Sequence, residues 1–228
     1  MDEIRSRKME FSTNGQQVPG YLAYPAGRSG PGLVVIQEFW GLVPHIEDVA
    51  ERFAREGFVA LAPDLYHGQA ATEPDEARKL AMALDRPRAV KEIGAAVRYL
   101  LDQEMTDPKR VGVVGWCMGG GLAIHAGGLI PEVSAVVVFY GQPPEADFVR
   151  QIHAPLLGLY AEHDHSISLE RVQAFKEALQ AQDIPSEIHV YPGTQHAFFN
   201  DTRPQIYDPQ AAQDAWQRTL DWFRKYLT

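Results

Sequence analysis

Short apolar runs alternate along the chain with segments in which apolar residues recur every three or four positions. The runs are rich in valine, leucine and isoleucine, as buried strands are, and the segments between them have the periodicity of helices. Such alternation predicts an α/β fold with a mostly parallel central sheet and helices on both faces. The predicted strands are residues 33–37, 58–62, 111–114, 133–140, 156–160 and 187–191, and the predicted helices are 45–56, two segments within 73–103, 168–182 and a closing segment from 208.

Residues 9–24 have a different pattern, with two extended stretches on either side of Asn14-Gly15, which predicts an antiparallel hairpin. Gly57 follows the helix 45–56 at the place of a C-terminal cap, and Pro87 suits the first turn of a helix. Asp208 and Pro209 are expected to begin the closing helix. Because no linker or internal repeat divides the chain, we predict one domain over residues 1–228.

Composition and charge narrow the possible partners. Hydrophobic residues make up 45% of the 228 residues and charged residues 22%, which is the balance of a globular protein with a substantial core. The formal net charge of −9 disfavours a nucleic-acid partner, since affinity for phosphates comes chiefly from lysine and arginine. No apolar run has the length of a membrane span, and the charged residues 1–8 lead into no signal-peptide core. We therefore expect a cytoplasmic protein, monomeric or weakly dimeric, with no nucleic-acid or membrane partner.

The residues 115–121, Gly-Trp-Cys-Met-Gly-Gly-Gly, follow the predicted strand 111–114. A reactive residue with glycines two positions before and after it is the pattern of a nucleophile elbow, a sharp turn from strand to helix. Gly115 and Gly119 take those positions around Cys117, the single cysteine of the chain. A lone cysteine is more often a small buried apolar residue, but the start of a helix favours a thiolate. We predict that Cys117 is a nucleophile.

Candidates for the acid and the base of a catalytic triad follow later in the chain. In α/β-hydrolases the order is nucleophile, acid, histidine, each after a later strand. Asp164 follows the strand 156–160, with Glu162 as the rival acid, and His196 follows the strand 187–191. The histidine can take the thiol proton, and the carboxylate can fix the tautomer of the ring. Taken singly, the aspartate could cap a helix and the histidine could be a solvated loop residue, but their shared order favours catalysis.

An oxyanion intermediate needs two preorganised N–H donors. The backbone N–H of Met118 follows the nucleophile, and the N–H of Phe39 lies in the loop after the strand 33–37. Several aromatic side chains near these loops could line an apolar pocket, although each could equally belong to the core. The predicted pocket residues are Trp40, Tyr66, Tyr140 and Phe198.

Two histidines, His163 and His165, lie on either side of Asp164. They could suggest a metal, but neighbouring residues on one short loop seldom converge on an ion without further ligands. We predict no metal and no cofactor.

With these motifs assembled, the chain resembles the dienelactone hydrolase family of α/β-hydrolases, which use a Cys-His-Asp triad. The resemblance implies the triad Cys117, His196 and Asp164. It also implies a role for Glu38, as a glutamate that pairs with the resting cysteine until substrate displaces it. A nearby carboxylate disfavours a thiolate, so the resting thiol is expected to be protonated. The resemblance is carried by residues 37–41, 62–66, 115–120, 139–141, 164 and 196–198.

The chain departs from the pattern of this family at two arginines, which hold the substrate carboxylate in the members that hydrolyse dienelactone. His67-Gly68 stands at the first place and Asn200 at the second. Arg203, Arg86 or Arg88 could supply a guanidinium instead. We therefore predict hydrolysis of a small ester or lactone through a thioester acyl-enzyme, and not specifically of dienelactone. The alternatives are another acyl-transfer hydrolase, such as a thioesterase or a peptidase-like enzyme, and a non-catalytic binding module of the same fold.

Overall fold

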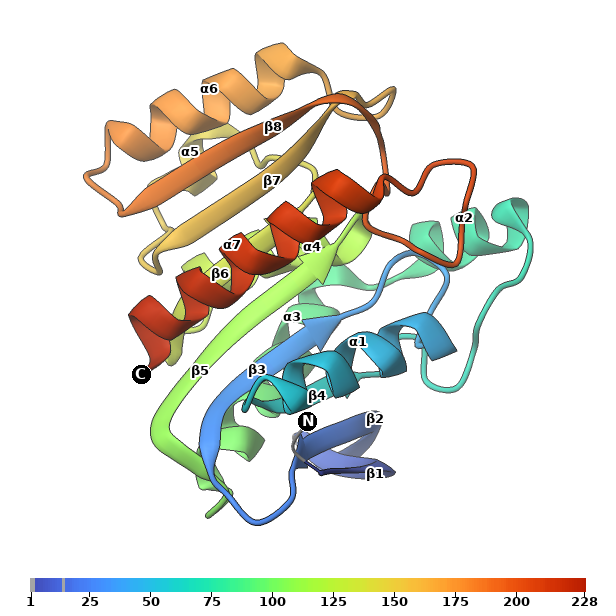
Figure 1. The fold of residues 1–228 in the computed structure, drawn as a ribbon, viewed down its shortest axis with the longest axis vertical. Helices are drawn as coiled ribbons and strands as arrows, with labels where there is room; N and C mark the ends of the chain where they lie inside the picture. The colour runs from blue at the N-terminus through green and yellow to red at the C-terminus, as the bar shows by residue number, and fades with distance from the viewer. Residues whose placement is uncertain (1–2, 14) are drawn as a thin grey trace.

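The computed structural model describes residues 3–13 and 15–228, whose strands form one mixed sheet (Figure 1). The strand order is β1-β2-β4-β3-β5-β6-β7-β8. The β1–β2 and β2–β4 pairs are antiparallel, and every later pair is parallel, so the predicted mostly parallel α/β fold is confirmed. The strands are β1 (Ile4–Thr13), β2 (Gln16–Pro25), β3 (Gly30–Ile36), β4 (Val59–Pro63), β5 (Thr106–Trp116), β6 (Val133–Phe139), β7 (Leu156–His163) and β8 (Ser186–Gln195).

Helices cover both faces of the sheet, because successive strand residues point to opposite sides. Val34 packs into the core under α3, α4 and α6, whereas its neighbours Leu33 and Val35 pack into the core under α1 and α7. Figure 1 shows α1 and α7 together on the near face. Among the described residues, no helix is both long and apolar enough to cross a membrane. The helices are α1 (Pro44–Arg55), α2 (Pro74–Ala83), α3 (Arg86–Asp102), α4 (Met118–Leu129), α5 (Ala146–Val149), α6 (Leu169–Gln180) and α7 (Pro209–Leu227).

The helix ends follow the capping residues in the sequence. The side chain of Asp85 accepts a hydrogen bond from the N–H of Arg88 at 3.0 Å, and Asp208 accepts one from Ala211 at 2.9 Å. Gly57 has a φ of 98° after α1, a conformation that glycine adopts without strain. The expected caps at Gly57 and Asp208 are therefore confirmed, and the structure adds Asp85 as the cap that precedes Pro87.

The main differences from the sequence prediction lie at strand ends. β5 begins at Thr106 and not at 111, and β8 continues to Gln195 and not to 191, where it pairs with His163 beyond a bulge in β7. Polar residues form these extensions, so hydrophobic periodicity did not mark them. The four-residue helix α5 was not predicted, and Asn14 of the expected hairpin turn lies outside the described residues.

Candidate active site

The predicted site residues gather at the carboxyl edge of the parallel strands. This edge is where α/β proteins place their ligands, because the loops that follow neighbouring strands meet there. Each loop contributes one polar or nucleophilic side chain. Glu38 follows β3, Tyr66 follows β4, Cys117 follows β5, Tyr140 follows β6, Asp164 follows β7 and His196 follows β8.

The backbone at Cys117 has the geometry of a nucleophile elbow. Its φ of 54° and ψ of −115° are unusual for a residue with a side chain, and such strain is typical of functional sites. A Cβ on Gly115 would lie 2.1 Å from the carbonyl oxygen of Gly119, and a Cβ on Gly119 would lie 2.4 Å from that of Gln37. Only glycine fits at either position, so both glycines are needed for the turn.

Asp164 and His196 form the second half of the triad. His196 Nδ1 lies 2.6 Å from Asp164 Oδ2, while Asp164 Oδ1 accepts hydrogen bonds from the N–H groups of Ser166 at 2.8 Å and Ile167 at 3.1 Å. The side chain of Asp164 is 1% exposed, so these donors stabilise a buried carboxylate. The rival Glu162 instead accepts from the N–H of Gly193 at 2.8 Å. The structure therefore places Asp164, and not Glu162, on the histidine.

The electrostatics of His196 link it to Cys117. Burial alone would lower the pKa of the ring, but hydrogen bonds with Asp164 and with Cys117, together with their charges, raise the pKa of His196 to about 10. Because Nδ1 is bonded to Asp164, Nε2 is the nitrogen left for the sulfur. The arrangement favours an imidazolium at His196, between Asp164 and Cys117.

The two predicted oxyanion donors lie beside the elbow. The carbonyl oxygen of Glu38 accepts from the N–H of Gly41 at 3.4 Å, and in a trans peptide the N–H of Phe39 then points the opposite way. Met118 begins α4, where a backbone N–H has no partner within the helix. The hydroxyl of Tyr66 joins the two segments, because it lies 3.2 Å from the carbonyl oxygen of Phe39 and 3.3 Å from the sulfur of Met118.

The aromatic residues divide into core and site. Phe198 is fully buried, with its ring 5.5 Å from that of Tyr140 and 5.0 Å from that of Tyr191. A ring without accessible surface has no face for a ligand, so the expected substrate contact of Phe198 is replaced by a packing role. Trp40 is partly exposed, and the guanidinium of Arg203 lies 5.4 Å from the centre of its ring.

Tyr140 is fully buried, so its predicted substrate contact is replaced by a packing role, as for Phe198, whereas Tyr66 is 5% exposed. Tyr140 lies with its ring 5.0 Å from that of His196, and its hydroxyl donates to Glu38 at 3.4 Å. Burial and then the charges of Glu38 and Cys117 raise the pKa of Tyr140. Burial and then the charge of Cys117 raise the pKa of Tyr66. Both phenols therefore remain protonated.

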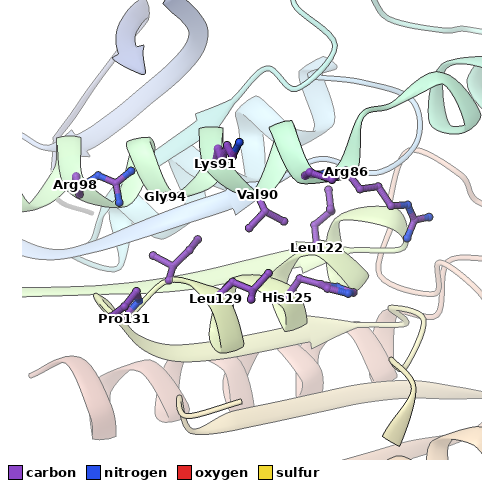
Figure 2. A pocket seen from close by; sticks show the side chains of 11 residues that line it. Arg86, Val90, Lys91, Gly94, Arg98, Leu122, His125, Leu129 and Pro131 are labelled. Carbon is purple, nitrogen blue, oxygen red and sulfur yellow. The ribbon is translucent and has the colours of Figure 1, made fainter. Parts of the chain in front are cut away.

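The other two candidate arginines lie elsewhere. Arg88 pairs with Glu92 at 3.5 Å, and the same carboxylate holds His67 at 2.9 Å. Arg86 lines a cavity of about 530 Å³ between α3 and α4, with Val90, Leu122 and His125 among its other lining residues (Figure 2). None of the triad residues lines this cavity. Arg203 is thus the candidate arginine that the structure places near the site.

Some of the site was not foreseen from the sequence. Gln37 is fully buried, and its side-chain oxygen accepts from the N–H of Leu65 at 3.2 Å, which ties the loop after β3 to the loop after β4. Asn200 is 2% exposed and donates to Glu38. A polar residue directly after an apolar strand was the only available signal for Gln37. Within residues 3–13 and 15–228, no three His, Cys, Asp or Glu side chains are arranged to hold a metal ion.

A mostly parallel sheet with a cysteine elbow, and a histidine held by an aspartate at the same edge, defines an α/β-hydrolase. The sequence model of the dienelactone hydrolase family matches residues 18–227. The chain belongs to the dienelactone hydrolase family, and it is a hydrolase that acts on ester bonds.

Relatives match over nearly the whole chain. "Protein usf" of Aquifex pyrophilus is 39% identical and covers 96% of this chain and 98% of its own. A protein of Aquifex aeolicus (strain VF5), provisionally named carboxymethylenebutenolidase, is 35% identical with the same coverage. The crystal structure of a provisionally assigned dienelactone hydrolase from Klebsiella pneumoniae subsp. pneumoniae MGH 78578 has a TM-score of 0.92 and 30% identity, covering 99% of this chain and 100% of that one.

Proposed function

We propose that the protein hydrolyses a small ester or lactone through a thioester acyl-enzyme on Cys117. The observation that carries this proposal is the convergence of an elbow cysteine and a buried Asp164–His196 pair at one edge of the sheet. A thiolate is the attacking form of cysteine, and the imidazolium favoured at His196 stabilises it. No cofactor is needed for this chemistry.

In the acylation step, Cys117 Sγ attacks the carbonyl carbon and the carbonyl oxygen becomes an oxyanion. The N–H groups of Phe39 and Met118 stabilise that charge. When the intermediate collapses, the carbon–oxygen bond of the ester breaks and His196 Nε2 gives its proton to the leaving alkoxide. The product of this step is an alcohol and a thioester, and in a lactone the alcohol stays on the same molecule.

In the deacylation step, His196 takes a proton from water, and the resulting hydroxide attacks the thioester carbonyl. The same two N–H groups hold the second oxyanion, and the carbon–sulfur bond breaks to release the carboxylic acid. Asp164 stays ionised in both steps, because it fixes the tautomer of the ring and stabilises the imidazolium. The cysteine is returned as a thiolate.

We place Trp40, Tyr66 and Arg203 at the wall of the substrate pocket. Trp40 is partly exposed and fixes the guanidinium of Arg203 by a cation–π contact. The positive charge of Arg203 lowers the pKa of Tyr140, against the larger effects that raise it, so the guanidinium lies within electrostatic reach of that phenol. This charge would favour substrates with an anionic group.

A substrate panel with a nucleophile variant tests the proposal. We expect the wild-type protein to cleave aryl esters or lactones, and Cys117→Ala to lower kcat by about 10⁶-fold, as removal of a triad nucleophile does. The panel pairs each ester with a matched acyl thioester and each neutral substrate with a carboxylate-bearing one. An unchanged rate in Cys117→Ala would contradict the covalent mechanism, and faster turnover of every thioester than of its ester would assign a thioesterase. Failure of the wild-type protein on the whole panel would favour the binding module.

A further inference from the structure

The cavity of about 530 Å³ between α3 and α4 has no role in the proposed reaction (Figure 2). Both helices pack on the face of the sheet opposite α1 and α7. None of the triad residues lines the cavity, and neither Phe39 nor Met118 does. Its volume lies in the range of roughly 300–1,000 Å³ that small-molecule sites occupy. The cavity is therefore large enough to hold a ligand of its own.

The inner lining of the cavity is apolar. Val90 of α3 lies opposite Leu122 and Leu129 of α4, and Ile130 follows directly (Figure 2). Leu129 is 49% exposed, so part of this apolar surface faces solvent. Gly94 adds space, because a Cβ built there would point at Ile130 Cδ1, 3.6 Å away. An occupant with an aliphatic body would remove this surface from water.

The charged groups at the cavity are positive. Arg86, Lys91 and Arg98 all come from α3, and none of the described lining residues carries a carboxylate. Arg98 lies 3.6 Å from Glu132, whereas Arg86 and Lys91 have no ion-pair partner within residues 3–13 and 15–228. Figure 2 shows Arg86 and Arg98 toward opposite ends of the cavity, with Val90 between them. Two unpaired cations beside an apolar surface fit an occupant with one negative charge at its end.

A second cavity of similar size shows that this excess of positive charge is particular to the α3–α4 cavity. The second cavity, of about 540 Å³, lies between the β1–β2 hairpin and the loop after β4, and its lining includes Glu10, Glu47 and Asp64 with Lys8. The whole chain has a formal charge of −9, which repels a long polyanion. A small monoanion responds mainly to charges within a Debye length of about 8 Å. The local cations therefore favour a small anion with an apolar body.

We propose that the cavity between α3 and α4 is a binding site for a small carboxylic acid with an aliphatic chain, such as a medium-chain fatty acid. The carboxylate lies by Arg86 and Lys91, and the chain extends over Val90 toward Leu129. Arg86 and Arg98 are twelve positions apart, which is about 18 Å along a helix and long enough for an extended chain of about ten carbons. This site is separate from the triad and does not depend on the proposed function.

Isothermal titration calorimetry with decanoate, below its micelle-forming concentration, tests the site. We expect decanoate to bind, and decanol, which lacks the charge, and acetate, which lacks the chain, to bind at least about tenfold more weakly. Arg86→Ala combined with Lys91→Ala should weaken decanoate binding by about tenfold. Higher salt should reduce that difference, because these cations are exposed.

A matched control removes two cations elsewhere. Arg78→Ala combined with Lys79→Ala changes the net charge equally, and both residues are exposed on α2 and do not line the cavity. This control should bind decanoate as the wild-type protein does. An equal loss in the two double variants, or equal affinity for decanol and decanoate, would overturn the proposal.

Two further variants locate the ligand. Gly94→Leu places a side chain in the cavity and should abolish decanoate binding, with the thermal midpoint Tm as the check on folding. Arg203→Ala, at the active site, should leave the dependence on Arg86 and Lys91 intact. Binding that only Arg203→Ala weakens would place the acid at the active site and overturn the proposal.

Absence of decanoate binding would overturn the proposal as well. If Leu129→Glu then converted a dimer to a monomer in sedimentation equilibrium, a second copy of the chain would be the occupant. Ester hydrolysis is a separate readout, so an inactive wild-type protein would contradict the proposed function and leave these titrations unaffected.

Discussion

Two buried carboxylates flank the nucleophile, and they are held in contrasting ways. Asp164 lies 2.6 Å from His196 and accepts two backbone N–H groups, so its charge acts directly on the proton-transfer residue. Glu38 accepts from a side-chain amide and a phenol, neither of which transfers a proton in the proposed reaction. Equal burial therefore does not mean equal function. The partners of a carboxylate decide whether it stabilises the transition state or is kept out of it.

The largest effect is expected from breaking the hydrogen bond between Asp164 and His196. Asp164→Asn removes the charge that stabilises the imidazolium and leaves the tautomer unfixed, so kcat should fall by about 10⁴-fold. The matched control is Glu162→Gln, because Glu162 accepts from the N–H of Gly193 and pairs with His163 rather than with His196, and its side chain is 41% exposed. The control should retain kcat within a few-fold. Steady-state kinetics on the best ester of the panel decide the assignment, and the reverse ranking would make Glu162 the acid.

A medium effect is expected at Gly119, where the nucleophile elbow packs against the loop that carries Glu38. A Cβ there would lie 2.4 Å from the carbonyl oxygen of Gln37, next to Glu38, so Gly119→Ala should lower the unfolding free energy by about 2–3 kcal/mol. Gly121→Ala is the control, since its nearest neighbour is 3.7 Å away and alanine favours a helix by up to about 1 kcal/mol. Urea unfolding of the two variants measures the difference. Equal stabilities would show that the elbow does not require the close approach.

The smallest effect within any one pH unit is a pH dependence of stability that distinguishes Asp164, the partner of His196, from Glu38. The pKa of His196 is raised to about 10 from an ordinary value of 6.5, so the folded state keeps a proton that the unfolded state loses. The stabilisation is complete below pH 6.5 and is lost as the pH rises through 10, with a slope of at most about 1.4 kcal/mol per pH unit. The stability difference between the wild-type protein and Asp164→Asn should therefore shrink over that range. A constant difference from pH 6 to 10 would contradict the pairing.

The sequence alone predicted the parts of the molecule that depend on local patterns. The buried strands β3, β4 and β6 are apolar runs, and the elbow and its glycines are a local motif, so all of them could be read directly. The outer part of β5 and the end of β8 consist mainly of polar residues, and helix α5 has only four residues, so none of the three gave such a signal. The aromatic Phe198 looked like a pocket residue because sequence does not distinguish a buried ring from a lining ring.

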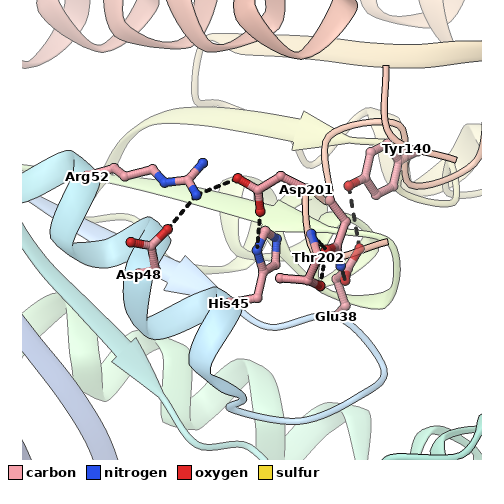
Figure 3. A network of polar contacts seen from close by, with 8 residues as sticks. Glu38, His45, Asp48, Arg52, Tyr140, Asp201 and Thr202 are labelled. Carbon is pink, nitrogen blue, oxygen red and sulfur yellow. Dashed lines mark hydrogen bonds and ion pairs between the residues drawn. The ribbon is translucent and has the colours of Figure 1, made fainter. Parts of the chain in front are cut away.

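The partners of Glu38 could not have been predicted in this way. Asn200 follows Glu38 by 162 positions, and their contact depends on the loop after β8 returning beside the loop after β3. Its orientation depends in turn on Thr202 and on the contacts of Asp201 with α1 (Figure 3). The family resemblance supplied a glutamate with an expected role, and the structure adds its two hydrogen-bond partners, Asn200 and Tyr140.

The most direct test of the account is intact-mass analysis of the protein quenched in acid during turnover of an activated ester. We predict that one acyl group is added, that peptide mapping locates it on Cys117, and that its lifetime is longer in the His196→Ala variant, because deacylation loses its base. Steady turnover without any acyl mass on Cys117, or with the acyl group on another residue, would contradict the central claim.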